Sequence, residues 1–107
     1  MTDKIVVLSA CSSAGQAERI ARRLVEKRLA ACVNVISGAR SIYRWRGQIE
    51  DAREWLLVIK SRRGLFDALR AELEGMHTYE VPEIIALSII EGSKEYLNWM
   101  ERELGEN

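Results

Sequence analysis

The spacing of hydrophobic residues divides the chain into strands and helices. Residues 4–11 are apolar or small and include several β-branched side chains, which is typical of a strand buried on both faces. Between residues 17 and 27, hydrophobic side chains recur at helical spacing with charged residues between them, which predicts an amphipathic helix capped by Ser12 or Ser13. The expected buried face of this helix consists of Ala17, Ile20, Ala21, Leu24 and Val25.

The segment from Ala31 to Ser61 predicts one long β-hairpin that turns at Arg46-Gly47. Aliphatic and β-branched residues occupy the base of both arms, and Gly47 supplies the positive φ that a tight turn requires. Arms of about fourteen residues reach about 45 Å at about 3.3 Å per residue. A globule of this length has a radius of gyration of only about 13 Å, so we expect the tip to project beyond the body.

The register of this hairpin follows from its turn. If Trp45 faces Gln48 and no bulge intervenes, Ile36 pairs with Leu57, and the apolar residues of both arms meet. The alternative is a bulge at Gly38 that folds the hairpin back over its own sheet, because glycines inside strands often mark such bends.

The tip of the hairpin is unusually apolar for a projecting element. Exposed aromatic and aliphatic side chains, together with unpaired strand edges, favour association. We therefore expect other copies of the chain to cover the tip. The predicted interface residues are Ile42, Tyr43, Trp45 and Ile49.

The remaining segments complete one domain, residues 1–107. A second amphipathic helix is expected over residues 64–75, a last strand over residues 84–90, and a third helix after Gly92-Ser93. The order is βαββαβ with an extra C-terminal helix. Right-handed crossovers then place both main helices on one face of a four-stranded antiparallel sheet, which is the ferredoxin-like α+β sandwich.

The amino-acid composition argues against two classes of partner. Sixteen basic and sixteen acidic residues cancel, so we expect neither nucleic acid nor a membrane as partner. RNA-binding modules of the same element order stack bases on strand aromatics, and residues 5–9 contain none. The apolar run at residues 5–8 is too short for a signal peptide or a membrane span, which predicts a cytoplasmic protein. Cys11 and Cys32 are expected to be reduced thiols.

His77 lies in a polar loop beside carboxylates and a phenol, and is the one histidine of the chain. Such a histidine can bind a metal or relay a proton, with Glu83 or Cys32 as partner. The alternative is a loop histidine whose nitrogens are satisfied locally, because one histidine lacks the several ligands of a dedicated metal site.

Cys32 and Lys60 lie in the arms of the hairpin and have two interpretations each. Cys32 is either a buried, inert thiol or a soft ligand for copper. Lys60 either guards against wrong strand pairing or binds an anion. The sequence contains no phosphate-binding glycine motif, nucleophile elbow or zinc-enzyme pattern. We therefore expect no catalytic residues, no enzymatic activity and no required cofactor.

Several motifs together resemble one family, the CutA divalent-cation-tolerance proteins, over almost the whole length. The matching motifs are residues 29–35, 41–49 and 77–86, followed by Gly92, Tyr96-Leu97 and Trp99. The resemblance implies a homotrimer of ferredoxin-like subunits, similar in architecture to the PII signalling proteins, and a role in tolerance of copper and other divalent cations. The sequence departs from some relatives at Thr78, and has Ser88 where proline is often found; neither change removes a ligand, though each could alter the shape of the cleft.

The resemblance also implies site residues near clefts between subunits. The metal ligands carried over are Cys32, His77 and Glu83. The ligand cleft carried over consists of Tyr43, Trp45, Lys60, Tyr79 and Glu80. The first hypothesis is therefore a trimer that binds divalent metal ions, copper above all. The alternative is a PII-like sensor that holds a small anionic ligand with Lys60.

Overall fold

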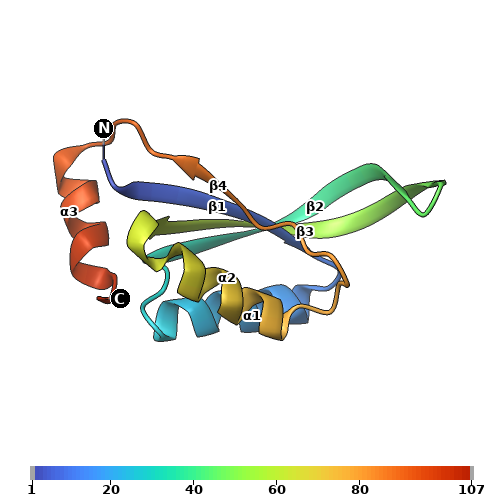
Figure 1. The fold of residues 1–107 in the computed structure, drawn as a ribbon, viewed down its shortest axis with the longest axis horizontal. Helices are drawn as coiled ribbons and strands as arrows, with labels where there is room; N and C mark the ends of the chain where they lie inside the picture. Colours follow the sequence, from blue (N-terminus) through green and yellow to red (C-terminus); the bar gives the residue numbers. More distant parts are fainter. Residues whose placement is uncertain (1, 107) are drawn as a thin grey trace.

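The computed structural model describes residues 2–106, which form four strands and three α-helices (Figure 1). The elements are β1 (Lys4–Cys11), α1 (Ala14–Glu26), β2 (Cys32–Trp45), β3 (Gln48–Arg62), α2 (Phe66–Met76), β4 (Ile85–Ser88) and α3 (Lys94–Glu103). The strands form one antiparallel sheet in the order β2-β3-β1-β4. Helices α1 and α2 lie side by side on one face, so the predicted ferredoxin-like α+β fold is confirmed.

Helix α1 forms where its hydrophobic spacing predicts it. The Ser13 hydroxyl accepts a 3.2 Å hydrogen bond from the backbone N–H of Gln16 and caps the first turn. Ala17 and Leu24 are fully buried, whereas Val25, predicted on the buried face, is 43% exposed. Val25 lies at the margin of the apolar stripe and faces a shallow hollow between α1 and β2, which explains the difference.

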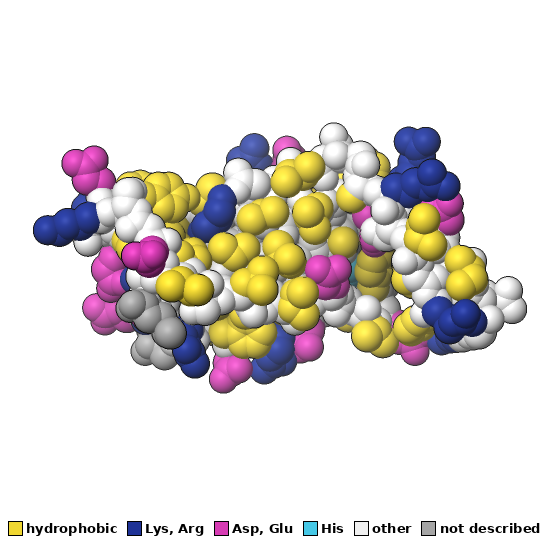
Figure 2. All heavy atoms as spheres, turned by 90° about the horizontal axis from the view of Figure 1, so that it is seen from above, with side chains coloured by type: hydrophobic (Ala, Val, Ile, Leu, Met, Phe, Trp, Pro, Cys, Tyr) yellow, Lys and Arg dark blue, Asp and Glu magenta, His cyan; other side chains and the backbone are white. Residues whose placement is uncertain are grey.

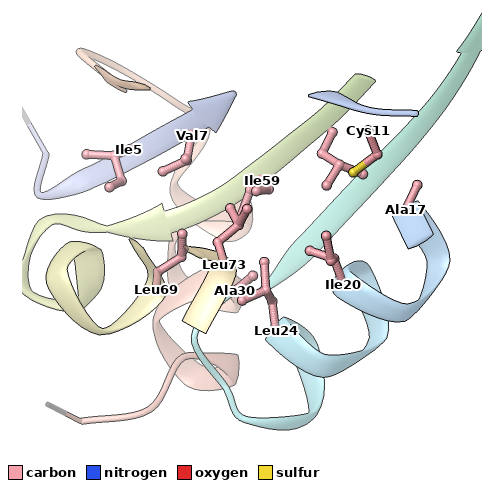
Figure 3. Packing of buried hydrophobic residues seen from close by; sticks show 11 residues of the cluster. Ile5, Val7, Cys11, Ala17, Ile20, Leu24, Ala30, Ile59, Leu69 and Leu73 are labelled. Atoms are coloured by element: carbon pink, nitrogen blue, oxygen red, sulfur yellow. The ribbon is translucent and has the colours of Figure 1, made fainter. Parts of the chain in front are cut away.

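The core lies between the sheet and the two helices (Figure 3). Alternate residues of the central strands, such as Val7 and Ile59, point toward the helices. Leu24 of α1 and Leu69 and Leu73 of α2 meet them with no exposed surface. Burial of each such aliphatic side chain stabilises the fold by about 1.5–3 kcal/mol.

The hairpin of β2 and β3 projects from this body, as predicted (Figure 1). The molecule measures 44 × 25 × 22 Å, and its radius of gyration is 14.3 Å. Trp45 pairs with Gln48 across the turn, and Gly47 has a φ of 80°. The tip therefore stands away from the helices that bury the rest of the sheet.

The register at the base of the hairpin differs from the unbulged prediction. Ile36 pairs with Leu56 rather than Leu57, because the pairing shifts between Ile36 and Ala39. Gly38 has a φ of 82°, the left-handed conformation that glycine adopts without strain in a bulge. The alternative prediction, a bulge at Gly38, is therefore confirmed as to where the bulge lies. The bulge does not fold the hairpin back over its sheet.

The C-terminal segments differ from prediction only in their limits. Strand β4 is shorter than the predicted residues 84–90, and α2 follows a 3₁₀ turn at Arg63–Leu65. Met100 of helix α3 and Leu104, which follows the helix, are buried together with Ala31 and Leu65. Glu101 of the same helix accepts a 2.7 Å hydrogen bond from the ammonium of Lys4. No helix within residues 2–106 has both the length and the hydropathy needed to cross a bilayer.

The sheet face opposite α1 and α2 is open and largely apolar (Figure 2). Its side chains alternate with those of the core, so they point away from the helices. Ile36, Ile85 and Leu87 on this face are between 47% and 52% exposed. This surface is an extended hydrophobic patch of the kind that usually marks an interface.

Candidate functional site

A cleft of about 430 Å³ lies where the hairpin leaves the body of the molecule. Strand β1 ends at Cys11, opposite Trp55, so the outer half of β3 has no β1 neighbour. The loop between α2 and β4 lies beside this part of the hairpin and forms the other wall. The lining residues are Ala10, Tyr43, Trp45, Arg46, Glu54, Thr78, Tyr79, Glu80, Val81 and Glu83.

His77 fixes the start of that loop. Its Nε2 lies 2.7 Å from the carbonyl oxygen of Ala10, which can only accept a hydrogen bond. Its Nδ1 accepts a 3.1 Å hydrogen bond from the backbone N–H of Tyr79. The two contacts select the neutral tautomer with the proton on Nε2. Both ring nitrogens are therefore engaged within one chain, and a metal ion could bind only if one contact broke.

Glu54 forms the buried acidic part of the cleft. Glu54 is only 6% exposed, and its Oε2 accepts a 2.6 Å hydrogen bond from the hydroxyl of Tyr79. Burial, and then the hydrogen bond to Glu54, raise the pKa of Tyr79 well above its ordinary value. Tyr79 therefore stays a neutral donor to the Glu54 carboxylate throughout the physiological pH range.

Cys11 is the thiol closest to His77. Its Sγ lies 3.9 Å from Nε2 of His77, and the residue has no exposed surface. Burial, and then the charge of Glu54, raise the pKa of Cys11 to about 11. The thiol is therefore protonated at neutral pH, and thiols in that state are poor nucleophiles and poor metal ligands.

An ion pair crosses the mouth of the cleft. Nη2 of Arg46, at the hairpin turn, lies 2.7 Å from Oε1 of Glu80 in the loop. The guanidinium carbon of Arg46 also lies 5.4 Å from the centre of the Trp45 ring, within the range of a cation–π interaction. The tip and the loop are thus joined by a contact that is exposed to solvent on both sides.

The structure brings together only part of the residue set carried over from the resemblance. Tyr43, Trp45, Tyr79, Glu80 and Glu83 line the same cleft, and His77 anchors its loop.

Cys32 and Lys60 lie elsewhere in the chain. They face each other near the opposite end of the sheet, where the ammonium of Lys60 donates to Oδ1 of Asn34. Lys60 is five residues from Trp55 along β3, roughly 16 Å from the cleft end of the sheet. Within residues 2–106, no three His, Cys, Asp or Glu side chains are arranged to hold a metal ion. Cys32, His77 and Glu83 could share an ion only across two chains.

Sequence reasoning missed Glu54, Arg46 and Cys11 as parts of the site. A signal for Glu54 exists, because strand alternation puts it on the same side of β3 as the apolar Leu56 and Val58. A buried acidic residue beside apolar neighbours on one side of a strand indicates a carboxylate with a specific partner. The closeness of Cys11 to His77 depends on two segments that are 66 residues apart in the chain.

Comparisons with known proteins agree with the fold. A family model described as CutA1 divalent ion tolerance protein matches residues 5–103. The divalent-cation tolerance protein CutA of Thermus thermophilus is 46% identical over 100 residues, which cover 94% of this chain and 97% of that protein. A solved structure of the divalent cation tolerance protein (Cut A1) from the same organism has a TM-score of 0.93 at 45% identity, covering 95% of this chain and 99% of that chain.

A mammalian relative is longer. Protein CutA of Mus musculus is 46% identical over 92 residues, which cover 86% of this chain but 52% of the mouse protein. This chain therefore corresponds to about half of the mouse relative's length.

Proposed function

The chain belongs to the CutA1 divalent ion tolerance family, and from this premise we propose that it is a homotrimer that binds divalent cations, copper above all, at its hairpin clefts. The observation that carries the proposal is the charge of the cleft. Among the described residues that line it, Glu54, Glu80 and Glu83 are acidic, and Arg46 is basic. Arg46 is already paired with Glu80, so the remaining carboxylates favour a cation.

Assembly is supported by the apolar surface that one chain leaves in water. Ile42 and Ile49 at the hairpin tip are each 65% exposed, and the neighbouring Tyr43 and Trp45 are 43% and 38% exposed. The open sheet face adds a second hydrophobic patch. Exposed surfaces of this composition usually lie between subunits. We propose three copies because the family resemblance implies a homotrimer.

A neighbouring subunit also offers the ligands that one chain does not bring together. Glu83 is exposed at the cleft, and Cys32 is partly exposed near the other end of the sheet. Copper prefers thiolate and imidazole ligands, and carboxylates can complete its coordination. We propose that Cys32 of one subunit meets His77 and Glu83 of another, with His77 released from its hydrogen bond to Ala10.

Calorimetric titration of copper into the purified protein tests this proposal. The ligand variants are Cys32→Ser, His77→Ala and Glu83→Gln. Glu74→Gln is the matched control, because Glu74 is an exposed carboxylate of α2 that pairs with Arg70 outside the cleft. Each ligand variant should weaken copper binding about tenfold or more, and the control should not. Equal affinity in all four variants would remove these ligands from the account.

The alternative, a PII-like sensor of a small anion, has less support. Lys60 lies outside the cleft and is engaged by Asn34. The cleft itself carries more carboxylates than cations among its described residues. An anion would have to overcome that charge, so the anion sensor stays a prediction without a structural observation in its favour.

A further inference from the structure

The carboxylates of the cleft do not form a cluster of three ligands among the described residues. Glu54 and Glu83 both line the cleft, yet no three acidic, histidine or cysteine side chains of residues 2–106 converge as a metal site. A small inorganic cation needs several oxygen ligands within about 2.0–2.6 Å. An extended cation with two charged ends has no such requirement, because each end can meet a different carboxylate.

The walls between these carboxylates are aromatic. Tyr43 and Trp45 come from the hairpin tip and Tyr79 comes from the loop, and all three line the cleft. Aromatic rings attract weakly hydrated organic cations through their faces and also bury apolar carbon chains. The volume of about 430 Å³ is in the range of small-molecule sites.

The chain already places one organic cation at this site. The guanidinium of Arg46 lies over the Trp45 ring and is bonded to Glu80 at the mouth of the cleft. This contact combines the two elements of organic-cation recognition, an aromatic face and a carboxylate. Tyr43 and Tyr79 line the same cleft as Glu54, whose carboxylate accepts the hydrogen bond from the Tyr79 hydroxyl.

We propose that the cleft binds an aliphatic diamine or polyamine, with one ammonium group at Glu54, another at Glu83, and the methylene chain against Tyr43 and Trp45. The inference goes beyond the proposed function, because it uses the same cleft but needs neither copper nor Cys32. A ligand of this class carries two or more positive charges and matches both the charge and the apolar walls.

Calorimetric titration with putrescine in a buffer containing EDTA tests the inference. The matched probe is n-butylamine, which has the same four-carbon chain and a single ammonium group. Putrescine should bind about tenfold or more tightly than n-butylamine, because only putrescine carries a second ammonium group for the second carboxylate. Absence of putrescine binding up to about 10 mM, or equal affinity for the two amines, would overturn the inference.

Variants identify the site. Glu83→Gln should weaken putrescine binding about tenfold, and Glu54→Gln should weaken it at least as much, whereas Glu74→Gln should leave it unchanged. Glu83 is exposed, so its variant is informative even if Glu54→Gln fails to fold. Unchanged putrescine affinity in Glu83→Gln would overturn the inference. Copper binding without putrescine binding would leave the proposed function standing, and the reverse result would leave only this inference.

Discussion

The hydroxyl of Tyr79 lies 2.6 Å from Oε2 of Glu54, so a loop residue holds a buried carboxylate of the hairpin. The contact joins the two walls of the cleft, one from β3 and the other from the segment after α2. The same hydrogen bond therefore contributes to the stability of the fold and to the geometry of the cleft.

Replacing Tyr79 by phenylalanine tests the strength of this contact. Tyr79→Phe removes the donor but leaves the Glu54 carboxylate, which is 6% exposed. A buried acceptor without its donor should lower the free energy of unfolding by about 1–3 kcal/mol in urea denaturation. The control is Tyr96→Phe, because Tyr96 is 43% exposed. Equal stability of the two variants would mean that water replaces the lost hydroxyl.

The pKa of Cys11 predicts a loss of stability in alkaline solution. Burial raises this pKa from 9.0 to about 11, so the unfolded chain loses the thiol proton at lower pH than the folded chain. The contribution is fully present below pH 9.0 and is lost as the pH rises through about 11.

Urea denaturation at several pH values in this window measures the effect. The free energy of unfolding of the wild type should fall more steeply than that of Cys11→Ala, which lacks this buried thiol and keeps only Cys32. Parallel curves for the two proteins would show that the thiol does not contribute.

The hydrogen bonds of His77 predict its tautomer. The proton should reside on Nε2 and Nδ1 should be an acceptor, because Ala10 offers a carbonyl and Tyr79 offers an N–H. ¹⁵N NMR of the imidazole at mildly alkaline pH distinguishes the two tautomers. His77→Ala should also lower the free energy of unfolding by about 1–3 kcal/mol, because it leaves both partners unpaired. A spectrum of the Nδ1–H form would contradict the anchoring role.

Helix α1 offers a matched pair of aliphatic substitutions. Leu24 has no exposed surface, and Leu24→Ala should lower the free energy of unfolding by about 2–5 kcal/mol. Val25 is 43% exposed, and Val25→Ala should change the free energy of unfolding by about 0.5 kcal/mol or less. Urea denaturation of both variants measures the difference. A large effect at Val25 would indicate that another subunit buries it.

Local patterns were sufficient to predict the fold. The strand at Lys4–Cys11 and the helix capped by Ser13 depend on residues near one another in sequence, and the structure confirms both. The register of the hairpin was less predictable. Counting from the turn gives correct pairs as far as Gly38, where a positive φ lets one extra residue enter β2 and shifts every pair beyond it.

The site was harder to predict because it is assembled from distant segments. The loop residues Tyr79, Glu80 and Glu83 were identified through the resemblance, and they do line one cleft. Glu54 was missed because no local pattern shows that Tyr79 reaches it across 25 residues of sequence. Cys32 was carried over as a ligand together with His77. Within one chain, however, Cys32 pairs with Lys60, whereas His77 contacts Ala10, which pairs with Leu56 nearer the hairpin tip.

The cytoplasmic location and the absence of catalysis stay predictions. Lys60 likewise stays a predicted ligand residue, although it lies outside the cleft in one chain. Its contact with Asn34 belongs to the open sheet face, where a neighbouring subunit would determine what it meets.

The central claim is that sister copies cover a hairpin and a sheet face that one chain cannot bury. Light scattering on the purified protein at micromolar concentration tests this claim most directly, because it gives the mass of the particle without reference to its shape. We expect a particle with three times the mass of one chain. A double substitution of Tyr43 and Trp45 by alanine should reduce the mass of the particle. A particle with the mass of a single chain would contradict the claim.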